Sequence, residues 1–462
     1  MKTSLFALAA LSLPVSALAQ VVIPESTATR VAASADRALE SDALAWDFVE
    51  GITTEVGPRQ AGTEAEARGR EWAVKWLKAN GFDNVAIEPF EMETWVPGDQ
   101  ASAGIVSPFP QSFVVAPLGG SASTGPEGIT AEVVNVGTVA ELAAMADGSL
   151  TGKIAYITHY MTPAQDGSHY GFAGPARWVG SGIAAQKGAV ATVIKSVGTD
   201  YHRNPHTGGA GFPEGVKPTP AGALSLPDAA NLERMFERTQ GPITMKLTLT
   251  PRDLGTTMSG NVVGEIVGSD PSLPPVLLAC HIDSWWNGTG AFDDGAGCGI
   301  VAAAAKAVSD AGQPLRTIRV LFAGAEETGL WGSKAYSAAH LDEPVAVGLE
   351  SDFGADRIWK FESNFREANP ALHNRIARAV ARFGVSNGMA VATGGADINI
   401  ARDQKTAIID LQQDGTRYFD LHHTPDDTLD KIDPVQLRQN VAVWTQVVGI
   451  LANEPNDIQA GE

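Results

Sequence analysis

The sequence is short of positive charge, cysteine and long apolar runs, and each shortage excludes a class of protein. Its 33 Lys and Arg residues stand against 53 Asp and Glu residues, a formal net charge of −20. Such a charge disfavours nucleic acid and anionic membranes as partners. Beyond the N-terminus no apolar run is long enough to cross a bilayer, so we expect no membrane partner. The 462 residues suffice for two domains with sizeable cores.

The N-terminus has the pattern of a cleavable signal peptide. Lys2 precedes an apolar stretch over residues 5–13, and the Ala-Leu-Ala at 17–19 forms a small-residue cleavage site before Gln20. We therefore expect residues 1–19 to be removed, and the mature protein to be soluble and either secreted or periplasmic.

Cysteine is limited to Cys280 and Cys298, which lie in one stretch of the chain. In an oxidising compartment the two could pair. We expect them instead to be two buried, unpaired small residues beside the candidate site.

Composition divides the chain into parts with different patterns. Residues 34–56 and 64–80 have helical spacing, and residues 85–93 alternate like a strand. The stretch that follows is rich in Gly, Pro, Ser and Thr, with short β-like runs, and predicts a small β-rich insert without a catalytic cluster of its own. We expect one domain from residues 20–94 and 252–462, and the insert at residues 95–251.

From Gly260 onward the pattern of strand, loop and helix repeats. This alternation predicts an α/β domain with a mostly parallel, mixed sheet sandwiched by helices. The expected strands are residues 276–280, 317–322, 345–350 and 407–411, and the expected helices between them include residues 298–311 and 370–383.

Each expected strand ends in histidine or acidic residues, the types of residue that can bind metal ions. A lone carboxylate at such a place is usually a helix cap, but four strand ends, two of them with histidine, are typical of a metal site. Imidazole and carboxylate ligands suit zinc, and a bridging carboxylate lets two ions share one hydroxide. The candidates, in chain order, are His281, Asp283 and Asp293; Glu326 and Glu327; Glu350, Asp352 and Asp356; and His422 and His423.

Five motifs of the chain together carry a family resemblance. They are His281-x-Asp283, GAFDDGAG, AEETG at residues 325–329, Ser351-Asp352, and His-Thr-x-x-Asp-Thr at residues 423–428. With them the chain resembles the co-catalytic zinc exopeptidases of the aminopeptidase Y and bacterial leucyl aminopeptidase type, and the likeness covers nearly the whole mature chain. The resemblance implies the zinc exopeptidase fold, a protease-associated domain at residues 95–251, two zinc ions, hydrolysis of short peptides, and a homodimer.

The resemblance also implies a role for each ligand. His281 and Asp352 would bind one zinc ion, Glu327 and His423 would bind the other, and Asp293 would bridge the two. In this family the bond after the bridging residue is often cis.

The catalytic and supporting roles come from the same resemblance. Glu326 would be the general base that activates the water shared by the two ions. Asp283 would fix the tautomer of His281 by a hydrogen bond, and Asp427 would steady the loop that carries His423. Tyr418 would stabilise the oxyanion or simply pack as an aromatic residue, and His422 would contact substrate.

Two other functions fit parts of this pattern. A glutaminyl cyclase-like acyl transferase uses similar motifs with one zinc ion, and a transferrin-receptor-like binding protein keeps the fold without the ligands. The full ligand set favours the peptidase.

The sequence does not decide whether the amino or the carboxyl terminus of the peptide is recognised. Asp356 and Glu350 would suit a substrate ammonium group, whereas Arg402 and Arg417 would suit a carboxylate.

Overall fold

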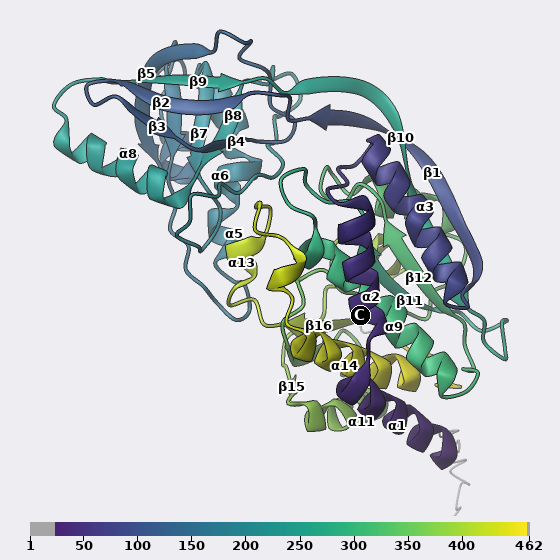
Figure 1. Ribbon diagram of the computed structural model, residues 1–462. Coiled ribbons are helices and arrows are strands. Elements are labelled where there is room, and N and C mark those ends of the chain that lie inside the picture. The colour runs from purple at the N-terminus through teal and green to yellow at the C-terminus, as the bar shows by residue number, and fades with distance from the viewer. Residues whose placement is uncertain (1–23, 460–462) are drawn as a thin grey trace, which may run out of the picture.

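The computed structural model describes residues 24–459, which form two eight-stranded sheets connected by a long ribbon (Figure 1). The predicted signal peptide at residues 1–19 lies outside the described residues. In the central sheet the four middle strands are parallel neighbours, and antiparallel strands flank them on both sides. The central sheet is therefore mixed: its four middle strands are parallel, and the short edge strand β15 also pairs in parallel with β14. Across the central sheet the strands are β1 (Asp83–Val96), β10 (Arg252–Ile266), β12 (Ile318–Ala323), β11 (Val276–His281), β13 (Val347–Glu350), β16 (Ala407–Gln413), β14 (Ile358–Ser363) and β15 (Ser386–Asn387).

Helices cover both faces of the central sheet. Along β11 the side chains of Val276 and Leu278 join the core that includes α9 (Ala296–Asp310), whereas Leu277 and Ala279 face the opposite core. This alternation is the period of two that a strand imposes. None of the helices within residues 24–459 is long and apolar enough to span a membrane. The other helices of this part are α1 (Glu25–Ser41), α2 (Leu44–Gly51), α3 (Glu64–Ala79), α10 (Trp331–His340), α11 (Pro370–Val380), α12 (Asn399–Asp403), α13 (Tyr418–Leu421) and α14 (Pro434–Ala452).

The helix expected over residues 34–56 is two helices, so this prediction is wrong in detail. α1 starts earlier and ends at Ser41, and α2 runs on into a short π-helical turn, Ile52–Val56. The Asp42 carboxylate accepts a hydrogen bond from the Ala45 backbone N–H at 3.1 Å, which satisfies a free donor at the start of α2. The apolar spacing continues through this break and hides it.

Residues 95–251, called the insert below, contain the second sheet. The ribbon of β1 and β10 carries the chain into it and back, pairing from Asp83 with Glu265 to Val96 with Arg252 (Figure 1). The strands of the second sheet, in order across it, are β3 (Gln111–Phe113), β2 (Ala101–Ser107), β9 (Ile243–Leu249), β5 (Ile129–Gly137), β6 (Ile154–Ile157), β7 (Ala191–Lys195), β8 (Ala221–Leu224) and β4 (Val115–Pro117). Its helices are α4 (Val139–Ala144), α5 (Tyr170–Ala173), α6 (Pro175–Trp178), α7 (Gly180–Gln186) and α8 (Leu226–Arg238).

Cys280 and Cys298 form a disulfide, so the expectation of two unpaired cysteines is wrong. Cys280 is in β11, and Cys298 is in the first turn of α9, which packs directly on that strand. Their Cα atoms are 5.2 Å apart, within the range that a disulfide can bridge. Packing of α9 on the sheet creates this proximity, and the spacing of the two residues in the sequence does not reveal it.

Candidate metal centre

The carboxyl ends of the four parallel strands meet at one edge of the central sheet. β11 ends at His281 and is followed by Asp283 and Asp293, and β13 ends at Glu350. The segments after β12, β13 and β16 carry the other candidate residues. Parallel strands end at the same edge, so these loops are neighbours. The convergence expected from the sequence is present.

His281 faces two carboxylates. Its Nε2 atom lies 3.1 Å from Asp293 Oδ1 and 3.4 Å from Asp352 Oδ1. Its Nδ1 atom faces the backbone carbonyl of Asp283 at 3.2 Å, with the Asp283 carboxylate slightly farther, at 3.7 Å. A proton on Nδ1 donated to that carbonyl leaves the Nε2 lone pair free for a cation. Asp283 thus orients this ring mainly through its main chain.

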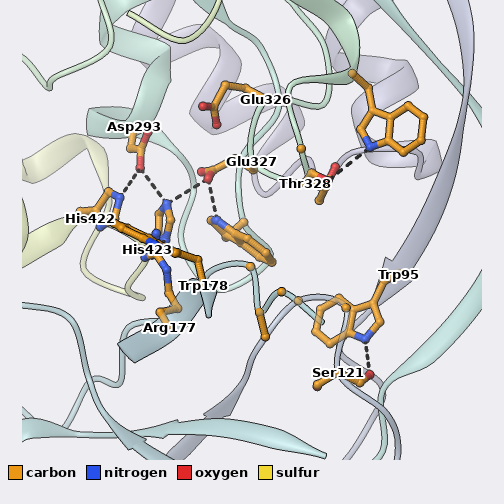
Figure 2. Close-up of a pocket in the computed structure, with 18 of the residues that line it drawn as sticks. Trp95, Ser121, Arg177, Trp178, Asp293, Glu326, Glu327, Thr328, His422 and His423 are labelled. Atoms are coloured by element: carbon orange, nitrogen blue, oxygen red, sulfur yellow. Dashed lines mark hydrogen bonds and ion pairs between the residues drawn. The ribbon is translucent and has the colours of Figure 1, made fainter. Parts of the chain in front are cut away.

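His423 faces a second pair of carboxylates. Its Nε2 atom lies 2.9 Å from Glu327 Oε2 and 3.5 Å from Asp293 Oδ2 (Figure 2). Asp293 therefore presents one oxygen to His281 and the other to His423. The two clusters share this single carboxylate, and the peptide bond that follows it is cis, as the resemblance implies.

His422 lies next to the second cluster. Its ring stacks on that of His423 with centroids 3.5 Å apart, and its Nε2 atom is 3.9 Å from Asp293 Oδ2. His423 is closer to Asp293 than His422 is, at 3.5 against 3.9 Å, and it also lies 2.9 Å from Glu327. Of these two histidines, His423 is therefore the better placed to form a cluster of three donors with Asp293 and Glu327.

The buried carboxylates repel one another. Burial, followed by the neighbouring carboxylate of Asp293, raises the pKa of Glu327 well above its usual value. Burial lowers the pKa of His281, but Asp352 and Asp293 outweigh it and raise that pKa well above its usual value. One oxygen of Asp293 has no hydrogen-bond partner within residues 24–459. Such a crowd of buried negative groups needs compensating positive charge, and its imidazole and carboxylate donors fit zinc.

Glu326 lies beside these clusters and faces the cleft (Figure 2). The residue before it, Ala325, has a left-handed backbone with φ of +57°. This conformation is uncommon for a residue other than glycine, and it is found at functional sites where the surroundings hold it. It turns the chain so that Glu326 and Glu327 leave in different directions, which the two roles expected of them require.

Three buried aspartates support the loops of the site. The Asp283 carboxylate accepts a hydrogen bond from the Glu326 backbone N–H at 3.0 Å, so it links two strand ends. Asp294 accepts one from the His281 backbone N–H at 3.1 Å. Asp427 accepts one from the Phe292 backbone N–H at 2.6 Å, so it steadies the loop of Asp293, whereas the resemblance implied the loop of His423.

A cleft of about 1440 Å³ opens over the candidate centre, between the central sheet and the insert. Tyr418 and His422 both line it, as do Tyr170, Trp178 and Lys217 of the insert. Tyr418 is buried, with its ring 4.4 Å from that of Phe353. Burial, then the nearby carboxylate of Asp293, raises the pKa of Tyr418 well above its usual value, so its hydroxyl keeps a proton to donate.

Two side chains at the centre are not singled out by the sequence. The Trp285 indole donates a hydrogen bond to Glu327 Oε2 at 2.7 Å. Arg177 comes from the insert, and its Nη1 atom lies 3.0 Å from His423 Nδ1 (Figure 2). Trp285 lies within a motif-bearing stretch, which is a usable signal. Arg177 is far away in the sequence and has no local signal.

Three of the four residues considered for binding a substrate terminus, Asp356, Arg402 and Arg417, are engaged with other groups of the chain. Arg417 donates to Asp356 through two nitrogens, at 2.6 and 2.7 Å. Glu350 accepts backbone hydrogen bonds from the loop after residue 395, and Arg402 donates to carbonyls of the same loop. The other carboxylate oxygen of Glu350, Oε1, has no hydrogen-bond partner within residues 24–459.

Comparison with known proteins gives consistent matches. The profile of peptidase family M28 matches residues 261–448. Carboxypeptidase Q from Bos taurus is 31% identical over 401 residues, which are 86% of this chain and 83% of that protein. The crystal structure of a peptidase M28 precursor from Shewanella amazonensis SB2B is 40% identical with a TM-score of 0.90, covering 94% of this chain and 99% of the other. A zinc aminopeptidase from Bacillus subtilis has the same fold at 19% identity, with a TM-score of 0.62 over 91% of this chain and 97% of the other.

Proposed function

The chain belongs to peptidase family M28 and is a zinc metallopeptidase of the exopeptidase type, and we propose that it holds two zinc ions and hydrolyses short peptides. The observation that carries the proposal is the sharing of Asp293 between two clusters of donors. His281 and Asp352 would hold one ion, and Glu327 and His423 the other. Asp293 would bridge them.

The bound zinc ions would supply Lewis-acid activation of the scissile carbonyl and of a water molecule. Glu326 would take a proton from that water as it attacks the carbonyl carbon, and would pass the proton to the nitrogen of the leaving amine. Burial, followed by the nearby carboxylates of Asp352 and Asp283, raises the pKa of Glu326 well above its usual value, which stabilises the protonated form that would pass the proton on. Tyr418 would donate a hydrogen bond from its hydroxyl group to the developing oxyanion, and His422 would contact the substrate.

The surroundings of the site support a preference for short peptides. The insert covers one side of the cleft, so the substrate is enclosed between two parts of the chain. We propose that residues 95–251 form a domain of the protease-associated type, and that residues 20–94 and 252–462 form the catalytic domain. The relatives named carboxypeptidase Q suggest cleavage near a carboxyl terminus. The predicted signal peptide supports a secreted or periplasmic location.

Metal analysis and one substitution test the proposal together. The purified protein is expected to hold two zinc ions per chain. Glu326→Gln is expected to lower kcat by about 100-fold to 10,000-fold, the usual contribution of a general base, without loss of zinc. Loss of zinc in that variant would make Glu326 a ligand and overturn its assignment. One ion per chain would favour a glutaminyl cyclase-like acyl transferase, and none would favour a binding protein.

A set of dipeptides with free and blocked termini tests the substrate class. Activity that disappears when the carboxyl terminus is blocked would indicate a carboxypeptidase or dipeptidase. Activity that disappears only when the amino terminus is blocked would indicate an aminopeptidase. Cleavage of peptides blocked at both ends would contradict an exopeptidase.

A further inference from the structure

A short segment of the insert, residues 199–208, holds the loop at residues 420–427 that carries His423. Thr199 donates a hydrogen bond to the Asp420 carboxylate at 2.7 Å. Asn204 donates to the Asp426 carboxylate, also at 2.7 Å. These two contacts connect the insert to both ends of the loop at residues 420–427.

A histidine and aspartate pair lies at the centre of this contact. His206 is fully buried; its Nε2 atom is 2.6 Å from Asp200 Oδ1, and its Nδ1 atom is 2.7 Å from the backbone carbonyl of His422. Both partners are hydrogen-bond acceptors, so the ring is held between the Asp200 carboxylate and the His422 carbonyl.

The backbone of His423 needs this support. Its φ is +63°, in the left-handed region that residues other than glycine seldom adopt. Such a conformation persists only where surrounding contacts hold it. The His423 carbonyl accepts hydrogen bonds from the Thr207 backbone N–H at 3.0 Å and from the Asn287 side chain at 2.7 Å. His206 holds the peptide unit on the other side, through the His422 carbonyl.

We propose that Asp200 and His206 are positioning residues that hold His423 in its left-handed conformation, with Nε2 directed at Glu327. The insert thereby completes the half of the metal centre to which His423 belongs. This proposal rests on the proposed function, in which His423 binds a zinc ion. The other half, with His281 and Asp352, is carried by β11 and by the loop after β13, and it does not depend on this contact.

Zinc titration against a competing chelator tests the proposal. The wild-type protein is expected to bind two ions, and His423→Ala to bind one ion tightly. His206→Gln is expected to bind one ion as tightly as the wild type and the other about 10–100-fold more weakly, the usual cost of losing a supporting partner. Asp200→Asn, a milder change that conserves volume, is expected to act in the same direction.

His373→Gln is the matched control. His373 is also buried, and both its ring nitrogens have hydrogen-bond partners, but these are Ser363, Arg366 and Asn387, which do not line the cleft. This variant should keep both zinc affinities even if its melting temperature falls. Two unchanged affinities in His206→Gln and Asp200→Asn, or an equal weakening of both ions, would overturn the proposal. Two tightly bound ions in His423→Ala would instead overturn the proposed function.

Discussion

Substitution of Trp285 with Phe isolates one hydrogen bond at the metal centre. The indole N–H of Trp285 donates to Glu327 Oε2 at 2.7 Å, and the same oxygen lies 2.9 Å from His423 Nε2. The side chain is only 3% exposed, so water does not readily replace the lost donor. Phe keeps an aromatic ring in the same packing and removes the N–H.

The size of the effect follows from the charge of the acceptor. A hydrogen bond to a charged group contributes about 1.5–3 kcal/mol. A tenfold change in affinity corresponds to about 1.4 kcal/mol, so the ion held by Glu327 and His423 should bind about 10–100-fold more weakly. The same range is typical of partners that orient a metal ligand. The ion held by His281 and Asp352 should be unaffected.

Zinc titration with a competing chelator measures both affinities in one experiment. Trp286→Phe is the control, because Trp286 packs beside Trp285 and Trp95 through ring contacts. Equal zinc affinities in Trp285→Phe and the wild type would refute the reasoning. Equal weakening in both tryptophan variants would show that packing, and not the hydrogen bond, supports the centre.

Three further predictions concern stability and the bridge. The disulfide joins residues 18 apart and restricts the unfolded chain, so reducing it should lower the free energy of unfolding by about 3 kcal/mol. Equal urea midpoints with and without reductant would contradict the bridge. Burial lowers the pKa of His159 to about 4, so the unfolded chain takes up its proton first as the pH falls from about 6.5. Stability should therefore decrease by at most about 3 kcal/mol between pH 6.5 and 4, and His159→Gln should flatten that slope in urea titrations. Asp293→Asn should weaken the binding of both zinc ions by at least about 100-fold. If one ion kept its wild-type affinity in a metal-binding assay, a bridging role would be excluded.

Local sequence patterns predicted the candidate residues that lie at the end of each strand. His281 and Asp352 follow apolar runs, and such runs predict buried strands whose ends lie at one edge of a parallel sheet. The two helices expected in the same domain formed close to their predicted ranges, because apolar spacing and turn residues act locally. The break between α1 and α2 escaped prediction because the helical spacing runs through it.

The long ribbon of β1 and β10 was only partly predicted. The sequence marked residues 85–93 as a strand, but the pairing extends over Asp83–Val96 and Arg252–Ile266. Strand length here depends on a partner that lies far away in the chain. No local pattern contains that information.

The sequence by itself determined the family, the central fold and the candidate ligands, because strand ends and motifs express these within short stretches. Only the tertiary structure decided that Cys280 and Cys298 pair and that Arg177 and His206 of the insert reach the loop of His423. The two cysteines are 18 residues apart, and the contacts of Arg177 and His206 span 246 and 216 residues. Packing brings them together, and packing depends on the whole chain at once.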